Sequence, residues 1–124
     1  MTKKVMIVDD DPGVIFTVKR GMEGDGKDYE ITSASSGQEC LQILENNKIP
    51  DLILLDIMMP EMTGWEVYKR LKENDLWKEI PVVFLTARTD RTAKNAGGFL
   101  GDDYIEKPFK FPELKERIEK ILEK

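Results

Sequence analysis

Short runs of consecutive apolar residues recur along this chain, each followed by a segment whose apolar residues have helical spacing. Three of the runs are uninterrupted, at 5–8, 52–55 and 82–85. A strand that is apolar at every position is buried on both faces, which is typical of a parallel sheet with helices on both sides. The pattern therefore predicts an α/β protein with a doubly wound parallel sheet.

Further elements complete this alternation. Strands are predicted at 29–34 and 103–106, and the last helix carries an apolar stripe through 114–122. Between the fourth and fifth strands, residues 90–96 have only weak helical character and are followed by two glycines. We therefore expect a short helix there.

Helix starts are marked by capping residues. Asp11 followed by Pro12 has the residue types of an N-cap and a first helical residue. Ser36 and Thr63 each precede a glutamate by three positions, which is the pattern of a capping box. These three positions predict the beginnings of three helices.

Composition excludes several classes of site. The chain of 124 residues has the length of one domain, so we expect a single domain over 1–124. The sequence has no histidine, which excludes histidine-based triads and histidine-ligated zinc. Cys40 is the only cysteine, so an intramolecular disulfide is excluded and a reducing, cytoplasmic setting is favoured.

Charge and hydropathy bear on the partners. The 24 acidic and 19 basic residues give a net charge of −5, and no basic cluster stands apart from acidic neighbours. This balance argues against nucleic acid or an anionic membrane as the main partner. No apolar run approaches the roughly 20 residues of a membrane span.

Acidic residues stand directly after two predicted strands. Asp9 and Asp10 follow strand 5–8, and Asp56 follows strand 52–55. The carboxyl ends of parallel strands meet at one edge of a sheet, so the three carboxylates converge if the two strands are neighbours. Clustered carboxylates repel one another, and a hard cation with oxygen ligands, Mg²⁺, would neutralise them.

Two other strand ends add the remaining groups of a phosphoryl-transfer site. Thr86 follows strand 82–85 and Lys107 follows strand 103–106, which adds a hydroxyl and a cation to the carboxylates and the metal. Each residue alone has an ordinary structural explanation, because Asp and Thr are common in caps and turns and lysine is commonly solvated. Their coincidence at one sheet edge favours function.

Several motifs resemble the receiver domains of two-component response regulators, over essentially the whole chain. The nearest type is the stand-alone, chemotaxis-regulator-like receiver. The resemblance implies a flavodoxin-like, five-stranded sheet with strand order 2-1-3-4-5 and a single receiver domain. Its motifs are Val8-Asp9-Asp10-Asp11, Leu54-Leu55-Asp56-Ile57-Met58-Met59-Pro60 with Gly64, Thr86-Ala87, and Asp102-Asp103-Tyr104-Ile105-Glu106-Lys107-Pro108-Phe109.

The resemblance also implies roles for the site residues. Asp56 would accept a phosphoryl group from a histidine kinase or a phosphotransfer protein. Asp10, Asp56 and the main-chain carbonyl of Met58 would bind Mg²⁺, Asp9 would act mainly through a water ligand, and Lys107 would contact the phosphoryl oxygens. The reaction would be self-catalysed on the protein's own aspartate, so the chain would not be an enzyme for an external substrate.

A conformational switch is the last feature that the resemblance implies. Thr86 would move toward the phosphoryl group and Tyr104 would rotate into the vacated space. The signal would reach the surface formed by helix 90–96, strand 103–106 and the last helix, where a downstream protein binds or a phosphorylation-dependent homodimer forms. The bond before Pro108 is expected to be cis.

Alternative functions differ in the residues that they need. A haloacid-dehalogenase-like phosphatase needs a second aspartate two positions after the nucleophile, where this chain has Met58. A phosphorylation-independent pseudo-receiver would be indicated by loss of an acid, the lysine or the threonine, and all are present. A flavodoxin-like cofactor binder needs a Ser/Thr/Gly-rich loop after the first strand, where this chain has acids.

Overall fold

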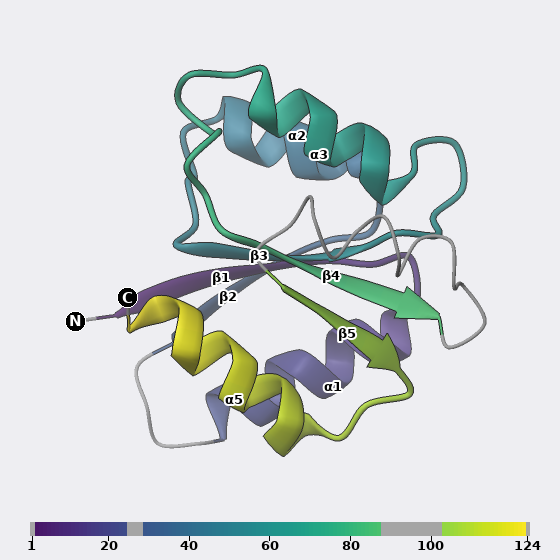
Figure 1. Ribbon diagram of the computed structural model, residues 1–124, viewed down its shortest axis with the longest axis vertical. Helices are drawn as coiled ribbons and strands as arrows, with labels where there is room; N and C mark the ends of the chain where they lie inside the picture. Colours follow the sequence, from purple (N-terminus) through teal and green to yellow (C-terminus); the bar gives the residue numbers. More distant parts are fainter. Residues whose placement is uncertain (1, 25–28, 88–102, 124) are drawn as a thin grey trace.

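Strands and helices alternate along the chain in the computed structural model, which describes residues 2–24, 29–87 and 103–123 (Figure 1). The predicted helix at 90–96 lies outside the described residues. The elements are β1 (Lys3–Val8), α1 (Pro12–Glu23), β2 (Tyr29–Ala34), α2 (Gly37–Glu45), β3 (Leu52–Asp56), α3 (Gly64–Lys72), β4 (Val82–Ala87), β5 (Asp103–Lys107) and α5 (Phe111–Leu122).

The strands form one parallel sheet in the order β2-β1-β3-β4-β5. The predicted fold class and strand order are therefore confirmed. β1 and β3 are direct neighbours, with Val8 opposite Leu55 in the register. The ends of these two strands consequently lie side by side, which is the condition for the acidic residues at these ends to meet.

Two hydrophobic cores lie on opposite faces of the sheet. Helices α2 and α3 cover one face, and α1 and α5 cover the other (Figure 1). Side chains of β3 alternate between them, because Ile53 and Leu55 belong to the core under α2 and α3, whereas Leu52 and Leu54 belong to the other. All four are fully buried, which explains the uninterrupted apolar run.

Helix caps follow the sequence pattern with one correction. The Asp11 carboxylate accepts a hydrogen bond from the backbone N–H of Gly13 at 2.8 Å, and Thr63 forms a complete capping box with Glu66. Ser36 caps α2, but the carboxylate of Glu39 accepts from the N–H of the preceding residue, Ser35. That capping box is thus shifted by one residue, because Glu39 meets the extended backbone just before the cap.

Three strands run further at their carboxyl ends than the sequence predicts. β3 includes Asp56, β4 includes Thr86 and β5 includes Lys107, each of which the sequence placed directly after its strand. The ladder continues there, with Thr86 opposite Glu106 and Ala87 opposite Lys107. The bond between Lys107 and Pro108 is cis, as expected.

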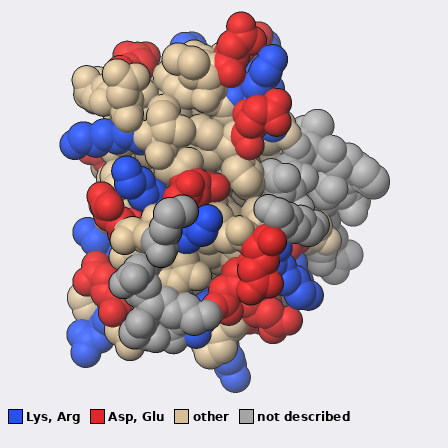
Figure 2. All heavy atoms as spheres, turned by 90° about the vertical axis from the view of Figure 1, so that its left-hand side faces the viewer, with Lys and Arg blue, Asp and Glu red and all other residues tan. Residues whose placement is uncertain are grey.

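The side of the molecule where β1 begins carries mixed charges. Figure 2 shows lysine and arginine side chains interspersed with aspartate and glutamate among uncharged residues on this face. Across the described segments, no helix combines the length and the apolar character that crossing a bilayer requires.

Candidate functional site

The site is a cluster of carboxylates at the edge where β1 and β3 end. Ligand oxygens of Asp9, Asp10 and Asp56 all lie within 4.8 Å of one another. Asp9 is fully buried and Asp56 is 4% exposed, while Asp10 is open to solvent. Hard oxygen donors at this spacing fit a hard divalent cation such as Mg²⁺, which Asp9, Asp10 and Asp56 would hold.

Lys107 supplies the positive charge of the cluster. Its Nζ lies 2.7 Å from Oδ2 of Asp9 and 3.3 Å from Oδ1 of Asp56. It reaches these acids from the last residue of β5, although β4 and β3 separate β5 from β1 in the sheet. The lysine therefore bridges the two buried carboxylates and contacts Asp9 more closely.

Asp9 is held by protein donors on both of its oxygens. Oδ1 accepts the backbone N–H of Asp11 at 2.9 Å, and Oδ2 accepts Lys107. Its own N–H donates to the carbonyl of Ala34 at 3.1 Å, which ties the end of β1 to the end of β2. A buried carboxylate costs less when its lone pairs are satisfied, so this arrangement fixes Asp9 as a rigid wall of the site.

Asp56 sits in an environment that favours its neutral form. Burial, followed by the negative charge of Asp9, raises the pKa of Asp56 to about 7, against the smaller lowering effect of Lys107. Burial alone would lower the pKa of Lys107, but its hydrogen bond to Asp9 and the charge of Asp56 outweigh this and raise it. Lys107 therefore stays an ammonium while Asp56 is poised between its two forms near neutral pH.

Gly64 fixes the loop that follows Asp56. Its N–H donates to the carbonyl of Ile57 at 2.9 Å. A Cβ at this position would collide with the main-chain oxygen of Asp56. Only glycine lets the start of α3 approach the end of β3 this closely.

The other predicted site residues lie in β4, in β5 and in the loop after β3. Thr86 is in β4, whose neighbours in the sheet are β3 and β5. Met58 follows β3 with its side chain 63% exposed. Tyr104 is half-buried in β5 and packs against the core under α2 and α3, and its carbonyl accepts a hydrogen bond from Arg117 at 3.2 Å.

A comparison with known families decides what the chain is. The family model described as the response regulator receiver domain matches residues 5–119. The chain belongs to this family. The resemblance to a receiver domain is thereby confirmed, and this domain is a component of two-component signalling.

Relatives of this receiver domain include whole regulators and isolated domains. The alkaline phosphatase synthesis transcriptional regulatory protein PhoP of Bacillus subtilis is 39% identical over 123 residues, which are 98% of this chain and 49% of PhoP. A crystal structure of a putative response regulator from Chloroflexus aurantiacus is 36% identical, with a TM-score of 0.90 and 100% of both chains covered. The chemotaxis protein CheY4 of Vibrio cholerae is 28% identical, with a TM-score of 0.86, and the match covers 98% of this chain and 99% of CheY4. The chain thus spans about half the length of its curated relative PhoP.

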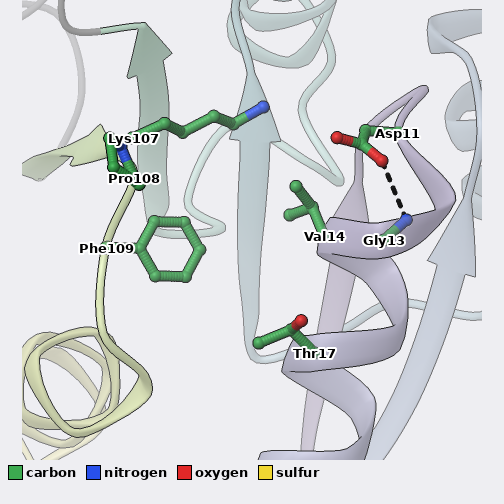
Figure 3. A pocket seen from close by; sticks show the side chains of 7 residues that line it. All are labelled: Asp11, Gly13, Val14, Thr17, Lys107, Pro108 and Phe109. Atoms are coloured by element: carbon green, nitrogen blue, oxygen red, sulfur yellow. Dashed lines mark hydrogen bonds between the residues drawn. The ribbon is translucent and has the colours of Figure 1, made fainter.

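A groove of about 390 Å³ beside the receiver site was not predicted from the sequence. It runs between the first turns of α1 and the loop after β5, and Asp11, Val14, Thr17, Lys107 and Phe109 line it with Gly13 and Pro108. Figure 3 shows the side chain of Lys107 extending across the upper end of the groove. Phe109 lies below Lys107 and faces α1. No motif signals this groove, because its two walls are about 90 residues apart in sequence.

Proposed function

We propose that Asp56 accepts a phosphoryl group from a phosphohistidine of a histidine kinase or phosphotransfer protein, with Mg²⁺ bound by Asp10, Asp56 and the Met58 carbonyl. Asp9 acts mainly through a water ligand, and Lys107 contacts the phosphoryl oxygens. The observation that carries this proposal is the meeting of three carboxylates and one lysine at one edge of the sheet.

The chemistry follows from the charges of the site. An oxygen of ionised Asp56 attacks phosphorus, a P–O bond forms, the P–N bond to histidine breaks, and the imidazole leaves with its electron pair. Charge builds on the equatorial oxygens, where Lys107 is held ready. Bound Mg²⁺ supplies further positive charge, which favours the ionised form of Asp56 despite its raised pKa.

Hydrolysis of the resulting acyl phosphate returns Asp56 to its carboxylate, so the domain turns over its own modification and no external substrate. The groove between α1 and the loop after β5 supports access of the donor, because it opens beside Lys107. We place this reaction in the cytoplasm and in a single receiver domain over residues 1–124.

A switch then carries the signal to a partner. Thr86 moves toward the phosphoryl group, and Tyr104 rotates toward it within the sheet. The half-buried position of Tyr104, the second residue of β5, supports this role. The output surface includes β5 and α5, where a downstream protein binds or a second phosphorylated copy docks.

Intact-mass measurement after incubation with acetyl phosphate tests the proposal. The wild-type protein is expected to gain one phosphoryl group only when Mg²⁺ is present, and Asp56→Asn is expected to gain none. An absent or Mg²⁺-independent adduct would refute the proposal and favour a phosphorylation-independent interaction module.

Neighbouring acids provide a matched pair of variants. Asp10→Asn removes a carboxylate of the cluster and is expected to lower strongly the Mg²⁺-dependent phosphorylation of Asp56. Asp11→Asn removes the next acid along the chain, which caps α1 outside the cluster and whose capping role asparagine retains. An equal loss of Mg²⁺-dependent phosphorylation in both variants would contradict the assignment of the metal site.

A further inference from the structure

Met58 differs from the other methionines that the structure describes. Its side chain is 63% exposed, whereas Met6, Met22 and Met59 are 0%, 1% and 6% exposed. Met62 is partly buried against the core under α2 and α3. A dissolved oxidant therefore reaches the sulfur of Met58 far more easily than the other described sulfurs.

The chain places Met58 on the same side of the sheet as the phosphoacceptor. Ile57 continues the ladder past β3, because its N–H donates to the carbonyl of Leu85 at 3.1 Å. Ile57 lies in the core under α2 and α3, together with Ile53 and Leu55. By strand alternation Asp56 and Met58 both point away from that core. Met58 lies two residues beyond the end of β3.

We propose that Met58 is a methionine-oxidation site whose sulfoxide shortens the lifetime of the phosphoryl group on Asp56. The oxidant is a peroxide: the thioether sulfur loses two electrons, an S–O bond forms, the O–O bond breaks, and hydrogen peroxide leaves as water. This inference rests on the proposed phosphorylation of Asp56.

The physical effect comes from the change in polarity. The thioether is apolar and a weak acceptor, so it cannot orient a water molecule beside the phosphoryl group. The sulfoxide oxygen is a strong acceptor on the same flexible side chain, and it accepts a hydrogen bond from a water that attacks phosphorus. One such hydrogen bond corresponds to a roughly 3- to 10-fold faster hydrolysis.

The single cysteine does not compete for the oxidant. Cys40 is fully buried, and burial raises the pKa of its thiol to about 12. Because the thiolate is the reactive form, peroxide attacks this residue slowly. Treatment with a thiol reductant reverses cysteine sulfenates and disulfides but leaves methionine sulfoxide intact, which separates the two chemistries.

Peptide mapping and phosphoryl decay test the inference together. The protein is treated with hydrogen peroxide and then with a thiol reductant. The gain of one oxygen is assigned to each methionine by fragmentation of the peptides, because Met58 and Met59 are adjacent in the chain. Oxidised and untreated samples are phosphorylated with acetyl phosphate, transferred to buffer without donor, and their decay is followed by intact mass. Met58→Leu, which keeps the main-chain carbonyl and an apolar side chain of similar size, is treated in the same way.

We expect Met58 to oxidise at least about 5-fold faster than the buried Met6, Met22 and Met59. Peroxide is expected to shorten the phosphoryl lifetime about 3- to 10-fold in the wild type and to leave that of Met58→Leu unchanged. An equally fast oxidation of buried methionines, an unchanged lifetime, or the same shortening in Met58→Leu would overturn the inference. If untreated wild type forms no adduct, the proposed phosphorylation fails instead, and the mapping arm still reports on Met58.

Discussion

Replacing Asp56 with asparagine is expected to stabilise the metal-free protein at alkaline pH, although it removes the phosphoacceptor. The ionised carboxylate is 4% exposed and lies beside Asp9. Asparagine keeps nearly the same shape without the charge, so Asp9 then keeps the whole charge of Lys107 and loses a repelling neighbour. The substitution therefore removes a source of electrostatic strain.

The magnitude follows from the pKa. The pKa of Asp56 rises from 3.8 to about 7, and each unit corresponds to about 1.36 kcal/mol. We therefore expect Asp56→Asn to raise the free energy of unfolding by about 2 to 4 kcal/mol at about pH 8. The folded state binds the proton of Asp56 more tightly than the unfolded chain does. The free energy of unfolding of the wild type therefore falls as pH rises from about 4 to above 7, whereas that of Asp56→Asn lacks this contribution. Below about pH 4 the carboxyl is neutral in both states and the difference vanishes.

Urea denaturation in excess chelator, at about pH 8 and at about pH 4.5, measures the difference. Asp75→Asn is the control, because it changes the net charge equally at a side chain that is 95% exposed. Adding Mg²⁺ is expected to reduce the difference in free energy of unfolding between Asp56→Asn and the wild type, since the metal binds the wild type more tightly. The reasoning fails if Asp56→Asn is no more stable than the wild type at the higher pH.

Three other substitutions test separate contacts. Lys107→Gln removes a cation from the cluster and is therefore expected to bind Mg²⁺ about 3- to 10-fold more tightly in calorimetry. At saturating Mg²⁺ its phosphorylation is expected to be at least about tenfold slower, because the lysine no longer contacts the phosphoryl oxygens. Weaker Mg²⁺ binding by the variant would contradict the first expectation. Thr63→Ala removes the capping box of α3 and is expected to lower the free energy of unfolding by about 1 kcal/mol in urea, so an unchanged midpoint would contradict the cap. Gly21→Ala brings a Cβ to 2.6 Å from the ring of Phe111 and is expected to cost about 1 to 3 kcal/mol, with partial recovery in the Gly21→Ala/Phe111→Leu protein; no recovery would show that this ring is not the obstacle.

The sequence predicted the elements of the fold well because local chemistry determines them. The run 52–55 is apolar at every position because both faces of β3 are covered, and Thr63 begins a helix by its own hydrogen bonds. Local chemistry does not encode which strands pair. The order of the strands came from the resemblance, since the contact of β1 with β3 joins residues more than 40 positions apart.

The candidate site was predicted as a set of strand ends but not as a network. Asp9, Asp10 and Asp56 were expected to meet, and they do. The N–H of Asp11 on Asp9 depends on how the chain turns into α1, and the closer contact of Lys107 to Asp9 joins residues 98 positions apart. Neither contact leaves a periodic signal in the sequence.

That closer contact gives Asp9 a second role in the proposed reaction. Phosphorylation replaces the single charge of Asp56 with a group that carries more negative charge, which attracts Lys107 further. The Nζ of Lys107 can contact the phosphoryl group without losing its contact with Asp9, because it lies 2.7 Å from Oδ2 of Asp9 and 3.3 Å from Oδ1 of Asp56. Asp9 in turn keeps its place through the N–H of Asp11. The cation is therefore positioned by an acid whose charge does not change in the reaction, so the same lysine can serve the free carboxylate and the acyl phosphate from nearly one position.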